Sequence, residues 1–223
     1  QYMLSGNGQK VISIHSIRPE EGKSFSSINL ACILALNDKK VLLIGADMRK
    51  PRLHHVFSRS NDSGLSTYLI GQSKYEDIIQ KTDIKNLYLL AAGPVPPNPA
   101  ELLERNLYKT LMERAREEYD FIVIDNAPVS MVTDGLITGK EADLNIFILR
   151  YGVSRKDQLK FINDMASKEV MKHSTLVIND IKGSRYGYGY HYYSYSYHYS
   201  YYGDDDQADR SFLSRYFKRK HKA

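Results

Sequence analysis

Short runs of apolar, largely β-branched residues alternate along the chain with longer stretches in which apolar residues recur at helical spacing. Strands are predicted at residues 10–15, 39–45, 87–91, 121–125, 144–149 and 174–179. Helices are predicted at residues 65–70, 75–79, 107–119 and 154–172, and residues 93–99 are predicted to form a loop. A further helix is predicted from Phe25 to Leu36, where Ile28 and Cys32 complete an apolar stripe. Strands that alternate with helices indicate an α/β fold whose mainly parallel sheet has helices on both faces.

The stretch between the first strand and the first helix, residues 16–24, is typical of a phosphate-binding loop. A strand, a tight turn and a helix N-terminus direct successive backbone N–H groups and the positive end of the helix dipole to one point, which suits a polyphosphate. Gly22 lets backbone approach the phosphates, Lys23 supplies positive charge, and the Ser24 hydroxyl can ligate Mg²⁺. An ordinary strand-to-helix turn with a solvated lysine is the alternative. The predicted nucleotide-binding residues here are Glu21, Gly22, Lys23, Ser24 and Phe25.

One feature of the sequence supports the interpretation as a phosphate-binding loop, and another departs from the usual pattern of such loops. Asp125 closes the apolar strand at 121–125, where a carboxylate can hold Mg²⁺ through water beside the phosphate loop. Ligands of parallel sheets bind beyond the carboxyl ends of the strands, and Asp125 lies at such an end. An aspartate that merely ends a strand at a turn is the alternative, but the presence of Gly22, Lys23 and Ser24 earlier in the chain favours the Mg²⁺-binding role. Against the pattern G-x-x-x-x-G-K-[ST], the first glycine is replaced by Ile17.

Composition limits the other possibilities. The net charge of +5 arises mainly from a basic C-terminus, which we interpret as a solvated end, so no nucleic-acid partner is expected. No apolar run approaches the roughly 18 residues that span a bilayer, and no signal peptide is recognised, so we expect any membrane link to lie outside this segment. Cys32 is the single cysteine, which excludes a disulfide within the chain and fits a reducing cytoplasm.

The chain is predicted to divide into a domain at residues 1–182 and a low-complexity tail at residues 183–223. In the tail, tyrosines alternate with glycine, serine and histidine, without aliphatic residues up to residue 203, which favours a mobile segment over a strand. Mobility suits a substrate peptide; an aromatic tract for association or base stacking is the alternative. The predicted phosphate acceptors are Tyr186, Tyr188, Tyr190, Tyr192, Tyr193, Tyr195, Tyr197, Tyr199, Tyr201 and Tyr202.

Four segments, in their order along the chain, resemble the bacterial tyrosine kinases. They are residues 18–31, 47–54, 98–103 and 119–125. More specifically, roughly residues 9–182 resemble the cytoplasmic kinase domain of polysaccharide co-polymerases, which control the assembly of capsule and exopolysaccharide. The resemblance implies a P-loop ATPase fold and an ATP- and Mg²⁺-dependent autokinase.

The resemblance also implies roles for individual residues. Lys23 and Ser24 match the Walker-A lysine and serine, Asp47 matches the second aspartate of the Walker-A′ motif, and Asp125 matches the Walker-B aspartate. Lys23, Asp47 and Asp125 are therefore the expected catalytic residues, and Ser24, Asp47 and Asp125 the expected Mg²⁺ ligands. Asn179 matches an asparagine that contacts adenine in related ATPases, although a strand-end turn residue is an equal alternative.

Family members phosphorylate one another's C-terminal tyrosines within a ring of subunits, and phosphorylation disperses the ring. The resemblance therefore implies three partners: further copies of this chain, a membrane-embedded co-polymerase portion, and a cognate tyrosine phosphatase. It places the chain on the cytoplasmic side of the bacterial inner membrane. The ring-forming helix that the family has before the first strand is not recognised in this sequence, so ring formation by this segment alone is not implied.

One departure bears on catalysis. Gly45 stands where the Walker-A′ motif normally has its first aspartate, which removes negative charge from a place where Mg²⁺ and the tyrosine proton need it. Two alternatives to a kinase stay open on the same P-loop framework, and Gly45 gives some support to the second. One is an ATPase of the partition or division-site type, although Arg18 stands at the place of its signature lysine. The other is a nucleotide-gated scaffold without catalytic activity.

Overall fold

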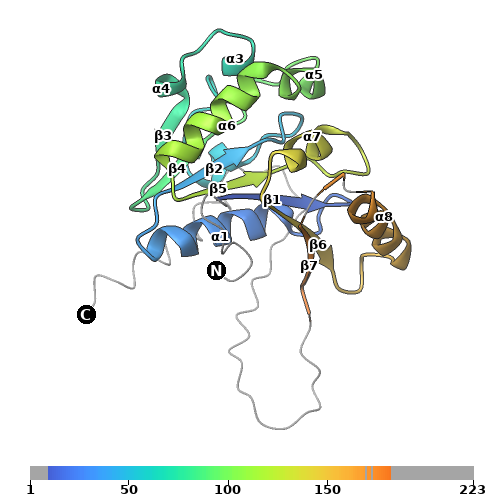
Figure 1. Cartoon of the computed structure of the whole chain (residues 1–223). Coiled ribbons are helices and arrows are strands. Elements are labelled where there is room, and N and C mark those ends of the chain that lie inside the picture. Colours follow the sequence, from blue (N-terminus) through green and yellow to red (C-terminus); the bar gives the residue numbers. More distant parts are fainter. Residues whose placement is uncertain (1–9, 169, 172, 182–223) are drawn as a thin grey trace, which may run out of the picture. The chain divides into compact units, whose positions relative to one another are not determined.

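The computed structural model describes residues 10–168, 170–171 and 173–181, and it has a sheet at its centre (Figure 1). The order of the seven strands in this part of the chain is β3-β4-β2-β5-β1-β6-β7. All neighbours are parallel except β3 and β4, which are antiparallel. The strands are β1 (Val11–Ser16), β2 (Val41–Gly45), β3 (Ile79–Lys81), β4 (Leu87–Leu90), β5 (Phe121–Asp125), β6 (Leu144–Arg150) and β7 (Ser174–Asn179).

Helices cover both faces of the sheet: Figure 1 shows α1 on one face and α6 on the other. Helix α1 packs against β1, β2 and β5. The predicted α/β fold with a mainly parallel sheet is therefore confirmed. The helices of the described part are α1 (Lys23–Leu36), α2 (Leu53–Val56), α3 (Leu65–Leu69), α4 (Tyr75–Ile78), α5 (Pro99–Leu103), α6 (Asn106–Glu118), α7 (Asp134–Lys140) and α8 (Lys156–Ser167).

The core forms because strand residues point alternately to the two faces of the sheet. Leu42 and Ile44 of β2 belong to the same buried cluster as Leu111 and Ala115 of α6. A second cluster joins β6 to α8 and also buries Ile17, the residue in the place of the first loop glycine. The central strands β1 and β2 are buried along their whole length, which agrees with the continuous apolar runs in their sequences.

The predicted apolar face of α1 is wrong. Phe25 and Leu36 are 50% and 47% exposed, and the face that meets the sheet contains the smaller residues Ser27, Ala31 and Ala35 together with Ile28. Small side chains at every fourth position allow the helix to lie close to the strands, whereas bulky ones would hold it away. The spacing of large apolar residues therefore identified the helix but not its buried side.

Several short elements differ from the prediction. Helix α5 begins at Pro99 inside the predicted loop, and proline is well suited to a first helical position. Helix α8 ends at Ser167 rather than at residue 172, because the chain turns there and buries Met171 against β6. The sequence did not predict α2, α7 or β3. In α7, Gly139 lowers helix propensity, yet a Cβ there would lie 2.9 Å from Asn145 Oδ1, which hydrogen bonds hold in place, so the glycine avoids a close contact.

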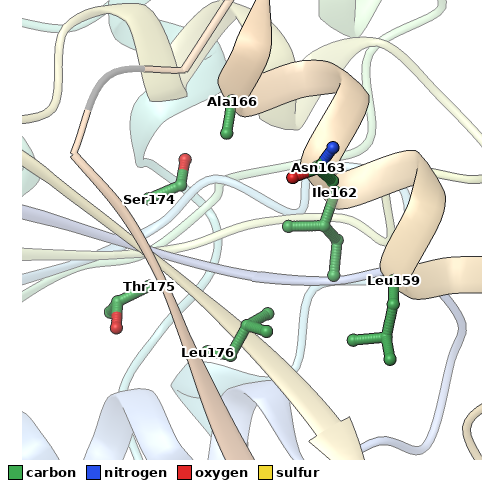
Figure 2. A pocket seen from close by; sticks show the side chains of 7 residues that line it. All are labelled: Leu159, Ile162, Asn163, Ala166, Ser174, Thr175 and Leu176. Carbon is green, nitrogen blue, oxygen red and sulfur yellow. The ribbon is translucent and has the colours of Figure 1, made fainter.

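Strand β7 lies at the edge of the sheet and is only partly covered. Its residues Leu176, Val177 and Ile178 are 45%, 42% and 56% exposed. Figure 2 shows an open groove in which Leu159 and Ile162 of α8 project toward Leu176 of β7. The residues that line it are Leu159, Ile162, Asn163, Ala166, Ser174, Thr175 and Leu176. None of them is a predicted site residue, so this groove is separate from the predicted phosphate site.

Two other predictions concern membrane-spanning helices and the boundary between domain and tail. Within it, no helix is both long and apolar enough to cross a bilayer. Residues 182–223 lie outside the described residues, so the proposed boundary at residue 182 stays a prediction.

A buried histidine in the centre of the sheet makes stability depend on pH. His15 Nε2 lies 2.9 Å from Asn145 Oδ1, and the Asn145 amide nitrogen donates to Gly139 O. The Asn145 oxygen is therefore the acceptor, and the histidine carries its proton on Nε2. Nδ1 is buried without a hydrogen-bond partner. Burial thus lowers the pKa of His15 from 6.5 to about 4, because a second proton would have no acceptor.

We predict that folding stability falls as pH falls from 6.5 toward 4, since the unfolded chain binds a proton that the folded chain rejects. The gap of about 2.5 between the two pKa values corresponds to about 3 kcal/mol. Urea unfolding at several pH values would show a shallower pH dependence in His15→Gln than in the wild type. The exposed His173→Gln serves as the control and should keep the wild-type dependence. Parallel curves for His15→Gln and the wild type would contradict the prediction.

Candidate functional site

The predicted phosphate loop joins β1 to α1 and ends in a sharp turn. Gly22 adopts the left-handed conformation with φ of 95°, and α1 begins at the next residue. No side chain caps the first turn of α1, and that turn contains no acidic residue. Its backbone N–H groups and the positive end of its dipole are therefore available to an anion.

A buried ion pair connects this loop to β5. Lys23 Nζ lies 2.6 Å from Asp125 Oδ1, and the two side chains are 8% and 4% exposed. Ser24 donates to Asp125 Oδ2 at 2.7 Å, and Ser27 donates to Asp125 Oδ1 at 3.1 Å. Residues that are about a hundred positions apart in the sequence thus form one polar cluster. Its oxygen atoms are of the kind that Mg²⁺ prefers.

Asp47 lies beside this cluster, just beyond β2. Its backbone N–H and that of Ala46 both donate to Asp125 O, at 3.2 and 2.8 Å. Its Oδ1 accepts the N–H groups of Arg49 and Lys50 at 3.3 and 3.0 Å. Burial raises the pKa of Asp47 above its usual value, and the charge of Asp125 acts in the same direction. The nearby Lys23 and the two N–H donors oppose this rise.

Gly45 is the direct neighbour of Asp125 across the β2–β5 pair. A Cβ atom at Gly45 would meet Ala92 N and Leu53 Cδ1 at 3.4 Å, which are ordinary contact distances. The backbone therefore accepts a side chain here. Because paired residues on parallel strands point to the same face, a carboxylate at this position would lie on the side of Asp125.

Three further predicted residues surround the loop. The Asn179 amide donates to Glu21 O at 3.2 Å and lies so close to Gly22 that a Cβ there would be 2.0 Å from its nitrogen. Phe25 is half exposed in the first turn of α1. Glu21 is 1% exposed, and its carboxylate contacts protein groups rather than solvent. The predicted acceptor tyrosines, Tyr186–Tyr202, lie outside the described residues.

Sequence reasoning missed several polar residues at the site. Ser27 follows Lys23 by one helical turn, and this spacing was the available signal. Arg49 and Asp134 carried no such signal. The Arg49 guanidinium forms two hydrogen bonds to the buried Asp134 carboxylate, at 2.9 and 3.1 Å, which connects the turn after β2 to the start of α7.

The residues present fit a nucleotide with its metal ion. The uncapped start of α1 and Lys23 suit phosphate groups, and the Ser24 hydroxyl beside Asp125 suits a hard cation. The described part has no cluster of three or more histidine, cysteine or acidic residues.

The parallel sheet, the loop after its central strand and the carboxylate on the adjacent strand place the chain in the class of P-loop nucleotide-binding proteins. A family described as AAA domain matches residues 9–146. Tyrosine-protein kinase Ptk of Acinetobacter johnsonii is 38% identical over 186 residues, which cover 83% of this chain and 25% of that protein. Tyrosine-protein kinase CpsD of Streptococcus pneumoniae is 33% identical over 187 residues, with 82% of each chain covered. This chain therefore belongs to the bacterial tyrosine kinase family.

Solved structures agree with this assignment. The kinase domain of Escherichia coli tyrosine kinase Etk superposes with a TM-score of 0.79 at 30% identity, covering 86% of this chain and 75% of that one. The cell division ATPase MinD of Pyrococcus furiosus has a TM-score of 0.64 at 23% identity, covering 76% and 71%, and it shares the fold alone. The relatives differ in length, and this chain spans only a quarter of the length of the Acinetobacter protein.

The buried pair predicts a large effect of Asp125→Asn on the protein without nucleotide. Lys23 would keep its charge in a buried site and lose its partner, which typically costs about 3–5 kcal/mol. The control is Asp83→Asn, because Asp83 forms an ion pair of the same 2.6 Å length with Arg59 but is 77% exposed. That substitution should cost less than about 1 kcal/mol.

Urea unfolding of both variants would measure the difference in the free energy of unfolding. Equal losses in the two variants would show that the burial of the Lys23–Asp125 pair does not determine its contribution.

Proposed function

We propose that this chain is the kinase domain of an ATP-dependent tyrosine autokinase, with the acceptor tyrosines in its own C-terminal tail. The observation that supports this most is the joining of Lys23, Ser24 and Asp125 in one buried cluster beside Asp47, at the sheet edge where nucleotides bind. The family of the chain supports the same activity. The proposal includes the division into a domain at residues 1–182 and a substrate tail at residues 183–223.

All the predicted site residues of the domain except Glu21 have a proposed task toward Mg-ATP. Gly22 and the first N–H groups of α1 bind the phosphates, and Lys23 neutralises the β- and γ-phosphates. Ser24, Asp47 and Asp125 hold Mg²⁺, directly or through water. In this proposal Asn179 and Phe25 contact the nucleotide, and Asn179 exchanges its hydrogen bond to Glu21 O for one with adenine. Bound Mg-ATP supplies the phosphoryl group and the metal charge that stabilises its transfer.

The proposed reaction transfers the γ-phosphoryl group to a tail tyrosine of another subunit. The tyrosine oxygen forms a bond to the γ-phosphorus while the bond from that phosphorus to the β,γ-bridging oxygen breaks. ADP leaves with the electron pair of that bond, and the phenolic proton passes to the Asp47 carboxylate and then to solvent. The raised pKa of Asp47 suits this task, because a more basic carboxylate accepts a proton more readily.

Regulation follows from the charge of the product. Each phosphotyrosine adds about −1.5 to −2 charges, so a modified tail would repel the tails of neighbouring subunits. We propose that the full-length protein forms a homo-oligomeric ring at the cytoplasmic side of the bacterial inner membrane, together with a membrane-embedded co-polymerase portion. In this proposal phosphorylation disperses the ring, a cognate tyrosine phosphatase reverses it, and the cycle controls the assembly of exopolysaccharide or capsule.

One observation favours a second candidate. Gly45 leaves the Walker-A′ position without its usual carboxylate, so the chain would also suit a nucleotide-gated scaffold or an ATPase that transfers phosphate to water. Release of inorganic phosphate without phosphotyrosine would identify the ATPase, and nucleotide binding without either product would identify the scaffold.

The kinase proposal predicts that the purified chain, incubated with Mg-ATP, gains phosphate on tyrosines between residues 186 and 202. Lys23→Met should abolish this product, because the substitution removes the charge that faces the transferred group. Lys85→Met is the control, since Lys85 is 84% exposed and pairs only with a surface aspartate in the described part. Phosphopeptide mass spectrometry would identify the sites, and circular dichroism would confirm that both variants are folded.

Gly45→Asp tests the missing carboxylate. The position accepts a Cβ at ordinary contact distance, so the variant should fold, and a third carboxylate beside Asp47 and Asp125 should increase the initial rate of tail phosphorylation by strengthening the Mg²⁺ site. The measurement is the initial rate of tail phosphorylation at several Mg²⁺ concentrations. Absence of phosphotyrosine in both the wild type and this variant would refute the kinase proposal.

A further inference from the structure

A buried carboxylate inside the phosphate loop has no place in the proposed reaction. Glu21 is 1% exposed and immediately precedes Gly22. Its negative charge is unfavourable here, because a carboxylate next to a polyphosphate repels the phosphate groups. Glu21 therefore needs a structural role that offsets this repulsion.

Four hydrogen bonds account for the burial of Glu21. Its Oε2 accepts the backbone N–H groups of Ile17 and Arg18, both at 2.9 Å. Its Oε1 accepts the Ser154 hydroxyl at 2.5 Å and the Gln158 amide at 2.9 Å. A carboxylate has about four acceptor sites, so its capacity is used in full. Glu21 therefore closes the first turn of the loop from inside and joins it to α8.

The donors cannot easily be rearranged. Gln158 accepts the Arg155 N–H through its own oxygen, at 2.5 Å, so its NH₂ group must face Glu21. Ser154 accepts the Arg150 N–H at 2.8 Å, so its hydroxyl proton is directed to Glu21. The orientation of both side chains is thus determined by the backbone, and only an acceptor fits at the position of the Glu21 carboxylate.

This arrangement also explains how the loop keeps its conformation although Ile17 replaces the first glycine of the phosphate-loop pattern. The Ile17 side chain is anchored in the cluster of β6 and α8, and its N–H is bound by Glu21. The N–H groups of Ile17 and Arg18 are therefore satisfied by the protein, and those at the start of α1 are left for a ligand.

We propose that Glu21 is a positioning residue that preorganises the phosphate loop for nucleotide and couples the loop to the N-terminus of α8. It acts through the backbone of Ile17 and Arg18 and through Gln158, not by contact with the nucleotide. The inference rests on the proposed binding of Mg-ATP at this loop.

Glu21→Gln distinguishes positioning from simple electrostatics, because the two predict opposite results. Removal of a negative charge near the phosphates would by itself strengthen binding. Loss of positioning weakens it, since the new NH₂ group would face donors in either orientation: the NH₂ group of Gln158, or the backbone N–H groups of Ile17 and Arg18. We expect the Kd for Mg-ADP, measured by calorimetry, to rise about tenfold or more, as is typical when hydrogen bonds to a charged group are lost.

Glu20→Gln is the matched control. Glu20 is the exposed neighbour of Glu21, and the substitution removes the same charge near the same phosphates without touching the four hydrogen bonds. Its Kd should equal the wild-type value or be lower. Amide hydrogen exchange without nucleotide gives a second measurement. The N–H groups of Ile17 and Arg18 should exchange faster in Glu21→Gln than in the wild type, and at the wild-type rate in Glu20→Gln.

A compensating substitution tests the coupling to α8. In the double variant Glu21→Gln with Gln158→Glu, the amide and the carboxylate exchange places, so a donor again faces an acceptor and Arg155 N–H keeps its partner. Gln158→Glu alone places two buried carboxylates together and should weaken binding. The double variant should recover at least half of the loss of affinity on a logarithmic scale.

The outcomes separate this inference from the proposed function. If the wild type does not bind Mg-ADP, the proposed function fails and the inference fails with it. If the wild type binds and Glu21→Gln binds as tightly or more tightly, only the inference is overturned. If Glu21→Gln is unfolded, Ser154→Ala is measured instead, because it removes one of the four hydrogen-bond donors to Glu21. A higher Kd for Mg-ADP at an unchanged melting temperature then supports positioning by Glu21. An unchanged Kd overturns the inference.

Discussion

The structure of the site depends on one buried ion pair, between the lysine of the phosphate loop and the aspartate at the end of β5. Neither Lys23 nor Asp125 can be buried alone, because an unpaired charge in a protein interior is strongly disfavoured. The pair forms only if β1 and β5 are neighbours in the correct register, since Asp125 must face the start of α1. Formation of the sheet and of the polar site are therefore coupled.

The position of β1 within the sheet explains the composition of the site. This strand lies between β5 and β6, so the loop after it is adjacent to the loops that follow both neighbours. The loop after β5 leads to Asp134, which holds Arg49 in the turn that orients Asp47. The loop after β6 supplies Ser154 to Glu21. Residues from four parts of the chain thus meet because parallel strands direct their carboxyl ends to the same edge of the sheet.

Most of the fold could be predicted from the sequence, and the errors share a cause. The long apolar strands and the helices α1 and α6 were found because their patterns are long enough to be distinctive. Short elements such as α7 and β3 were missed, because their propensities are weak and packing decides their conformation. The buried face of α1 was misidentified for a related reason: close contact with the sheet favours Ala31 and Ala35 over the larger Phe25.

By itself the sequence determined the class of fold, the phosphate loop, and Asp125 as its acidic neighbour, because these depend on local patterns and on the order of strand and turn. Asp47 was expected there only from the resemblance to the family. Only the tertiary structure decided which side chains meet. It paired Lys23 with Asp125, showed that Gly45 lies beside that aspartate, and turned Glu21 inward to α8. Contacts between residues about a hundred positions apart leave no periodic signal in a single sequence, since they arise from strand order and packing rather than from local propensity.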